Sequence, residues 1–452
     1  MAKAQDFTNG SIKKQILTFA LPILLGNLFQ QFYTLADTAI AGHILGDSAL
    51  SAIGATSSVS SLILTVAFGI NAGFGIVIAQ AFGEKNNRKL KRSFAQSIVF
   101  GLIFSVLVAT ISPLIINSVL RAMNTPEEIF SEARAYILIL LEFVIVTMFY
   151  NLEATVLRSL GDSKTSVIFI IISTVVNIFL DWLFMAKLNL GVKGAAAATV
   201  IAQGFSCVLC AAVIVKSFKI IKLEKDSFRK DIPLTRSLLT SGLVMGMMNS
   251  IFSIGSIILQ SAVNNLGSQI IAAQLAARKI SDMYMQPLVT VGTSCSTIVS
   301  QNYGAGKTKR IGQAINYSAV YSLIWSIIAV VTCYAFGRVL VVAITGTADT
   351  VIIDNALMYL KINTPFYFTL GLLFNLRFSI QSIDSKIPPL ISSSLELVSK
   401  IIAAFVLIKH YGYLGACVAE PISWVLGAIF LIFAFSSAYK KLKCKTTVLK
   451  EC

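Results

Sequence analysis

Twelve long apolar stretches constrain the fold of this chain more than any other feature. A helix needs about 20 mostly apolar residues to cross the ~30 Å hydrocarbon core of a bilayer. Membrane strands would instead alternate in polarity over about ten residues, and no such alternation is present. The sequence therefore predicts an all-α integral membrane protein with twelve transmembrane helices. The expected spans are residues 16–39, 50–80, 94–119, 135–157, 165–186, 193–215, 237–263, 270–300, 313–342, 354–380, 388–408 and 414–438.

The basic residues predict the orientation of these helices. The chain has 37 Lys and Arg residues against 21 Asp and Glu. If the N-terminus is cytoplasmic, 26 of the 37 fall in segments on the cytoplasmic side and seven on the other side. This bias follows the positive-inside rule, so we expect a multi-pass cell-membrane protein with both termini cytoplasmic. The net charge of +16 is then a topology signal, and the predicted partner is the lipid bilayer rather than nucleic acid.

An internal repeat divides the chain into two similar halves. Residues 79–92 (AQAFGEKNNRKLKR) resemble residues 300–311 (SQNYGAGKTKRI), and Gly83 matches Gly304. The same offset of 221 positions relates GVKGAAAA at 191–198 to GYLGACVA at 412–419, and Leu45-Gly46 to Leu266-Gly267. Three separated matches at one offset indicate a duplicated six-helix unit.

The repeat predicts two lobes and a mechanism class. We expect an N-lobe at 1–215, a cytoplasmic linker at 216–236 and a C-lobe at 237–452. Because six is an even number of spans, both copies enter the membrane in the same orientation. The lobes should then be related by a pseudo-two-fold axis along the membrane normal, which suits alternating access. A complete two-lobed transporter is expected to be a monomer.

Acidic residues inside the spans are the first candidates for a functional site. A carboxylate at the bilayer centre costs roughly 2.5–3.5 kcal/mol on insertion scales, so each one needs a partner or a purpose. Asn177 and Asp181 are four residues apart and share one helix face, and Asp37 lies in the first span. Their hard oxygen ligands suit a proton or Na⁺, although a helix–helix hydrogen-bond network is the alternative. The acids expected within spans are Asp37, Glu142, Glu153, Asp181, Glu396 and Glu420, four of them in the first half.

The fourth span has two acids eleven positions apart. Glu142 and Glu153 should share a face of one helix, with Glu142 near its outer end. An ion pair of Glu153 with Arg158 or with another helix is one interpretation, which has the same weight as the role that the family resemblance below implies. The spacing assigns no role to Glu142.

The second half differs in its charged residues. Glu396 and Lys400 are spaced i, i+4 and are expected to neutralise each other. Glu420 precedes Pro421, which suggests a position near the outer surface or at a helix break. Arg377 has no obvious partner within its own helix and stays unassigned. The coupling chemistry is therefore expected in the N-terminal half.

Flexible and aromatic residues of the second half suit a binding surface for varied substrates. Met248, Met283 and Tyr284 are substrate-binding candidates, with ordinary core packing as the alternative for each methionine. In the first span, Pro22 removes a backbone hydrogen bond and predicts a kink, which by itself can be static.

Several strings resemble the multidrug and toxic compound extrusion (MATE) family over essentially the whole chain. They are ALPILLGNLFQQFYTLADTAIAGHILGDSALSAIG (20–54), AQAFGEKN, NLEATVLRSLGDSKTS (151–166), NIFLDWLF (177–184), GVKGAAAAT (191–199) and SQNYGAGK (300–307). Details of the first half resemble the branch of the DNA-damage-inducible-type and staphylococcal multidrug exporters. The resemblance implies a two-lobed, V-shaped architecture and cation-coupled antiport.

The resemblance also implies roles for particular residues. Asp37, Asn177, Asp181 and Thr199 match an N-lobe cation site, which is also a possible Na⁺ site at the first three. Glu153 matches a glutamate that binds cationic drugs, and Pro22 a bending first helix. The acids that the sodium-type branch carries in spans 7 and 10 are missing from 245–260 and 366–381, which disfavours a C-lobe cation site.

The predicted function is antiport of amphipathic organic cations against H⁺ or Na⁺, with no cofactor. The chain has no metalloprotease, hydrolase or P-loop motif and only two His residues, which argues against an enzyme or an ATP-driven pump. A lipid-linked precursor flippase of the same superfamily is the alternative. Such flippases line the cleft with basic residues, whereas the site predicted here is acidic.

Overall fold

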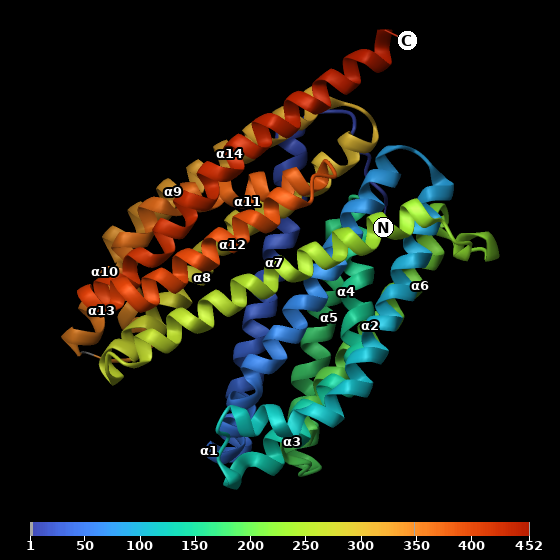
Figure 1. The fold of residues 1–452 in the computed structure, drawn as a ribbon. Helices are drawn as coiled ribbons and strands as arrows, with labels where there is room; N and C mark the ends of the chain where they lie inside the picture. The colour runs from blue at the N-terminus through green and yellow to red at the C-terminus, as the bar shows by residue number, and fades with distance from the viewer. Residues whose placement is uncertain (1–2, 348, 452) are drawn as a thin grey trace. The chain divides into compact units, whose positions relative to one another are not determined.

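The computed structural model describes residues 3–347 and 349–451, without the side chains of 33–36, 38, 39, 47, 48 and 445–451. All regular structure in this part of the chain is helical (Figure 1). The long helices are α1 (Ile12–Gly83), α2 (Asn87–Ala122), α3 (Glu127–Glu142), α4 (Val144–Ser159), α5 (Ser163–Asp181), α6 (Gly191–Ser217), α7 (Ile232–Asn264), α8 (Ser268–Gly304), α9 (Thr308–Thr345), α10 (Thr350–Asn363), α11 (Tyr367–Ser382), α12 (Ile387–Ile402) and α14 (Tyr413–Glu451). The short elements are η1 (Trp182–Lys187), η2 (Lys219–Ile221), η3 (Lys225–Phe228), η4 (Thr364–Phe366), η5 (Ala403–Leu407) and α13 (Ile408–Tyr411).

Nine helical segments of the described residues are long and apolar enough to cross a membrane, or ten if one bent pair counts as a span. That pair is α3 and α4, which meet at Phe143 with a bend of 47°. The expected span 135–157 is therefore bent, and Glu142 and Glu153 lie on two successive helices and do not share a face of one helix. The expected span 270–300 lies in α8, whose hydropathy is lowered by Arg278, Lys279 and Asp282.

The helices form two compact units. The first unit contains the residues up to Asp6 and Leu21–Gly246, and the second contains Phe7–Ala20 and the residues from Met247 onward. In the first unit, α6 packs against α3, α4 and α5. In the second unit, α14 packs against α10, α11 and α12, which are orange to red in Figure 1. The lobe boundaries expected from the sequence stay a prediction.

The backbone repeats with the offset seen in the sequence. Gly46 and Gly267 have positive φ values of 80° and 102°, a conformation that favours glycine, and each interrupts the helical path. π-helical segments follow α5 and α12 at the same offset, η1 beginning at Trp182 and η5 at Ala403. The two copies thus share local geometry as well as sequence.

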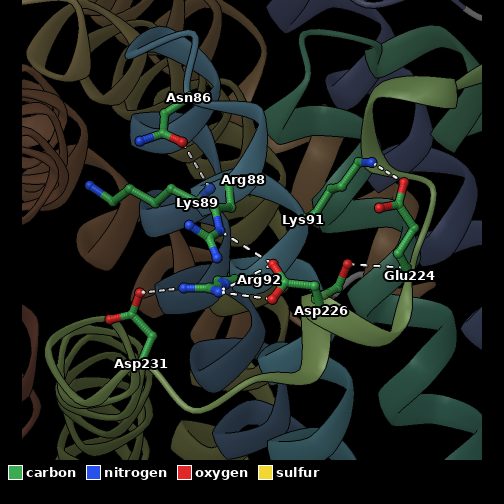
Figure 2. A network of polar contacts seen from close by, with 9 residues as sticks. Asn86, Arg88, Lys89, Lys91, Arg92, Glu224, Asp226 and Asp231 are labelled. Carbon is green, nitrogen blue, oxygen red and sulfur yellow. Dashed lines mark hydrogen bonds and ion pairs between the residues drawn. The ribbon is translucent and has the colours of Figure 1, made fainter.

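The segment after α6 is held against the first turns of α2 (Figure 2). Arg92 is the best-buried base of this network and contacts two acids of the segment. The ion pairs are Arg88–Asp226 and Arg92–Asp226, both at 3.2 Å, Lys91–Glu224 at 2.5 Å and Arg92–Asp231 at 3.4 Å. We call residues 218–231 the docked linker. It belongs to the first unit.

Candidate functional site: a buried carboxyl pair

The first unit brings together two carboxyl groups that are distant in the sequence. The side chains of Asp37 on α1 and Asp181 at the end of α5 interact directly. Asp181 has no exposed surface, and Asn177, one turn earlier on α5, is 1% exposed. Asp37 is half-buried. Of the predicted coupling residues, these three therefore have the burial that a site inside the membrane requires.

The polar atoms of this group are unsatisfied. Asp37 Oδ1, both carboxyl oxygens of Asp181 and both amide atoms of Asn177 are buried without a hydrogen-bond partner in the protein. Nearly all buried polar atoms in proteins have a partner, so five unpaired atoms in one place need an explanation. Two carboxylates cannot hydrogen-bond to each other, because neither is a donor. A shared proton or a small cation would satisfy them, and hard oxygen ligands fit either one.

Tyr136 on α3 completes the surroundings of the carboxyl pair. It interacts electrostatically with both Asp37 and Asp181 and is 8% exposed. It packs in an apolar cluster whose other buried members are Ala41, Ala49, Met185, Val192, Ala195 and Ala196. These side chains exclude water, which strengthens each electrostatic interaction at the pair. Sequence reasoning missed Tyr136, since nothing in its own segment indicates that its side chain lies near Asp37 and Asp181.

The backbone changes form beside Asp181. The π-helical segment η1 begins at the next residue, Trp182. π-Helical turns are rare and often occur at functional sites. Thr199, the fourth predicted coupling residue, is half-buried on α6, which packs against both α5 and η1. A role for Thr199 in coupling stays a prediction.

Glu153 is a second buried acid of the first unit. It is 8% exposed on α4, and its Oε2 atom has no hydrogen-bond partner. Its carboxyl group interacts with the thiols of Cys207 and Cys210 on α6. Arg158 donates instead to Thr155 Oγ1 over 3.0 Å. The alternative of a Glu153–Arg158 ion pair is therefore wrong among the residues that the structure describes.

The substrate candidates of the second unit do not form one cluster. Met248 is 3% exposed on α7, which matches core packing, whereas Met283 is 57% exposed on α8. The hydroxyl groups of Tyr284 and Thr332 are 2.9 Å apart. Met283 is thus available to a ligand, while Tyr284 is held in place.

The structure shows α1 continuing through Pro22. The one non-helical residue within α1 is Gly46, among the residues described. A kink at Pro22 stays a prediction.

The charges of the second unit are paired differently from the expectation. Glu396 and Lys400 do not neutralise each other, because each pairs with a neighbouring helix. Arg377 on α11 donates to Glu396, which gives the previously unassigned arginine its partner. Lys400 Nζ lies 3.1 Å from Glu420 Oε1 on α14. Glu420 is 4% exposed, and its expected position near the outer surface or at a helix break stays a prediction.

One further acid belongs to the spans of the second unit. Asp282 lies within α8 and is missing from the acids expected above, although its position within 270–300 was a sufficient signal. Its side chain is exposed and interacts with Arg278, four residues earlier. The two halves therefore differ less in the number of acids than in their pairing. The acids of the second unit face bases, and Asp37 faces Asp181.

Comparisons with known proteins agree with this architecture. The MatE family model matches residues 22–183 and again 245–406. The probable multidrug resistance protein YpnP of Bacillus subtilis is 26% identical over 401 residues, which cover 88% of each chain. The DNA damage-inducible protein F of Escherichia coli is 25% identical over 334 residues, or 70% of each chain. The crystal structure of MATE in the bent conformation matches with a TM-score of 0.91 at 22% identity, over 98% of this chain and 100% of that one. This likeness shows the fold, which has twelve transmembrane helices in two lobes, as the sequence predicts.

Proposed function

Because the chain belongs to the MATE family of multidrug and toxic compound extrusion transporters, we propose that it is a secondary active exporter of amphipathic organic cations. The family consists of transporters and not of enzymes. In this proposal, H⁺ or Na⁺ flows inward as the organic cation leaves. The protein works as a monomer in the cell membrane, with both termini in the cytoplasm.

The observation that carries the proposal is the unsatisfied pair of Asp37 and Asp181. Two like charges this close, in apolar surroundings, disfavour the doubly ionised state unless a proton or a cation lies between them. The pair therefore binds one positive charge when it faces one side of the membrane. It releases that charge when the lobe rearranges and water or another cation reaches the carboxyl groups. Asn177 supplies an amide oxygen that can bind Na⁺ or an amide N–H that can hold a carboxylate.

An organic cation is the substrate class that the charges favour. Glu153 offers a buried carboxylate without a basic partner, which attracts a positively charged group. A phosphate-bearing flippase substrate would need unpaired bases instead. Arg377 and Lys400 are each paired with an acid, which supports the export of cations over the flipping of lipid-linked precursors.

Transport in proteoliposomes tests the proposal. The purified protein is reconstituted, a pH gradient or a Na⁺ gradient is imposed, and a panel of cationic dyes is offered. We expect at least one gradient to drive dye transport, and the gradient that does so identifies the coupling ion. The Glu153→Gln variant should lose dye transport at unchanged expression, whereas Glu142→Gln, at an exposed acid, should keep it. Failure of both gradients with every dye would refute the proposal.

A further inference from the structure

The docked linker attaches to the first unit through every third residue. Phe218, Ile221 and Ser227 are buried, and the first two belong to the apolar core of this unit. Glu224, at the remaining position of the row, pairs with Lys91 of α2 (Figure 2). We call the four linker residues 218, 221, 224 and 227 the inner row. They fix one side of the linker against the protein.

A second row, shifted by one position, faces away from the protein. Its members are all exposed and begin in the last turn of α6; they are Lys216, Lys219, Lys222, Lys225 and Phe228. Side chains three positions apart line up in a 3₁₀ helix, which is the form of η2 and η3. The pattern of burial and the local helical form therefore agree. We call these five residues the outer row.

The lysines of the outer row have no counter-charge within the protein. Among the side chains that the structure describes, no acid forms an ion pair with any of them. The acids of the linker are engaged elsewhere, since Asp226 and Asp231 both contact Arg92 of α2. Arg229 and Lys230, next to the outer row, are exposed as well. The positive charge of this face is thus available to a partner of opposite charge.

The position of the linker indicates which partner is near. The linker joins α6 and α7, and both helices are long and apolar enough to cross a membrane. Ile232, the first residue of α7, is 78% exposed, and Phe228 is 51% exposed. Exposed apolar side chains at the end of a span lie against lipid, and bases beside them lie at the level of the headgroups. The outer row therefore borders the bilayer.

We propose that the outer row is a binding surface for anionic phospholipids. Its ammonium groups pair with headgroup phosphates, and the ring of Phe228 inserts at the boundary between headgroups and acyl chains. Bases clustered next to a membrane span attract anionic lipids, and each base adds to the affinity. The inner row holds the lysines in line, which sets this surface apart from dispersed bases elsewhere on the chain. The inference concerns a lipid partner and does not depend on the transported substrate.

Lipid binding by the solubilised full-length protein tests the inference. Phosphatidylglycerol or phosphatidylcholine is titrated into the protein, and bound lipid is counted by native mass spectrometry. We expect phosphatidylglycerol to bind more tightly than phosphatidylcholine. A triple variant of the outer row should weaken the affinity for phosphatidylglycerol by about tenfold or more, because each base contributes. This variant is Lys219→Gln/Lys222→Gln/Lys225→Gln.

The matched control removes the same number of charges from the second unit. Lys309, Lys440 and Lys441 are exposed lysines that form no ion pair among the described residues. The variant with Gln at these three positions should keep the affinity of the unaltered protein. Equal affinities in the two triple variants would overturn the inference, since net charge alone would then explain binding.

Phe228→Trp tests whether the outer row touches the bilayer. The variant is reconstituted in phosphatidylglycerol vesicles whose acyl chains carry bromine, which quenches tryptophan fluorescence on contact. The chain has three Trp residues of its own, so the signal of the unaltered protein is subtracted. We expect the added fluorescence to be quenched by the brominated chains. Fluorescence equal to that in vesicles without bromine would overturn the inference.

Inorganic phosphate separates a lipid surface from a site for free anions. In the mass spectra, inorganic phosphate at the concentration of the lipid should leave phosphatidylglycerol bound, because it offers no acyl chain to Phe228. Displacement of the lipid by phosphate would overturn the inference. None of these measurements uses transport, so a failure of the proposed function leaves their outcome unaffected.

Discussion

Glu396 and Lys400 are one turn apart on α12, yet they pair with different helices, Glu396 with Arg377 of α11 and Lys400 with Glu420 of α14. Opposite charges at this spacing would ordinarily be expected to pair along their own helix. Here they connect α12 to two neighbours inside the second unit. Both pairs are buried, so each charge depends on its partner for compensation.

Removing one member of the Arg377–Glu396 pair should destabilise the second unit strongly. Glu396→Gln leaves a buried guanidinium without its carboxylate, which typically costs about 3–5 kcal/mol. The double variant Arg377→Met/Glu396→Leu removes both charges and should cost much less. Thermal unfolding of the purified protein in detergent measures the difference. Equal losses in the single and double variants would show that the charge pair is not what stabilises this contact.

The Tyr136 hydroxyl group should contribute to coupling. Tyr136→Phe removes the polar group of α3 that interacts with both Asp37 and Asp181. We expect gradient-driven transport to slow by about fivefold, the effect of roughly 1 kcal/mol for a hydrogen-bonding group. Tyr150→Phe is the matched control, because Tyr150 is another buried tyrosine of the first unit whose electrostatic neighbours are Cys210, Arg158 and Cys207. Equal rates in the two variants would contradict a role for Tyr136.

The docked linker should detach at high salt and at low pH. A hydrogen bond from Arg88 holds the pKa of Asp226 below its usual range, and the charges of Arg88 and Arg92 act in the same direction. A lowered pKa means that this contribution to docking is complete above the unfolded value of about 3.9 and is lost as the pH falls below it. Salt acts at any pH, because the Debye length shrinks to about 3 Å at 1 M.

Limited proteolysis within residues 218–231 measures this detachment. Arg92→Ala should increase cleavage at neutral pH and low salt, since Arg92 contacts both Asp226 and Asp231. Lys89→Ala should not, because Lys89 pairs with Glu84, which lies outside the linker. Cleavage that responds to neither salt nor Arg92→Ala would rule out ionic docking.

Gly73 should tolerate no side chain. A Cβ atom at this position of α1 would collide with the backbone of Ser241 and Gly242 in α7, both within the first unit. Gly73→Val should therefore cost at least about 1–3 kcal/mol, the usual range for overpacking. Gly54→Val, on the same helix but with nothing within 4 Å of its added Cβ atom, is the control. Thermal unfolding of the two variants should differ clearly, and similar melting temperatures would contradict the close approach.

The sequence predicts most of the fold because the bilayer imposes strong rules on composition. Local spacing along the sequence predicts the span lengths, the repeat offset and the shared face of Asn177 and Asp181. The structure confirms the repeat offset, because the backbone features of the two copies recur at the same spacing. The bend at Phe143 leaves no local signal, as neither Pro nor Gly lies there. The sequence also does not predict the ion-pair partners of Arg377 and Glu420, because these depend on which helices pack together. Spacing along one helix suggested the pair of Glu396 and Lys400, and tertiary contacts replaced it.

The central claim is that Asp37 and Asp181 bind the coupling ion, and dye transport by matched variants tests it most directly. Asp37→Asn and Asp181→Asn are reconstituted with the unaltered protein, and dye transport is followed under the gradient that drives it. Asn keeps the size of the side chain but cannot exchange a proton or neutralise a cation. Both variants should still bind dye but lose gradient-driven transport by a factor of about ten or more. A factor of ten corresponds to about 1.4 kcal/mol, and the loss of the charge should cost at least this much free energy. Full gradient-driven export by either variant would contradict it.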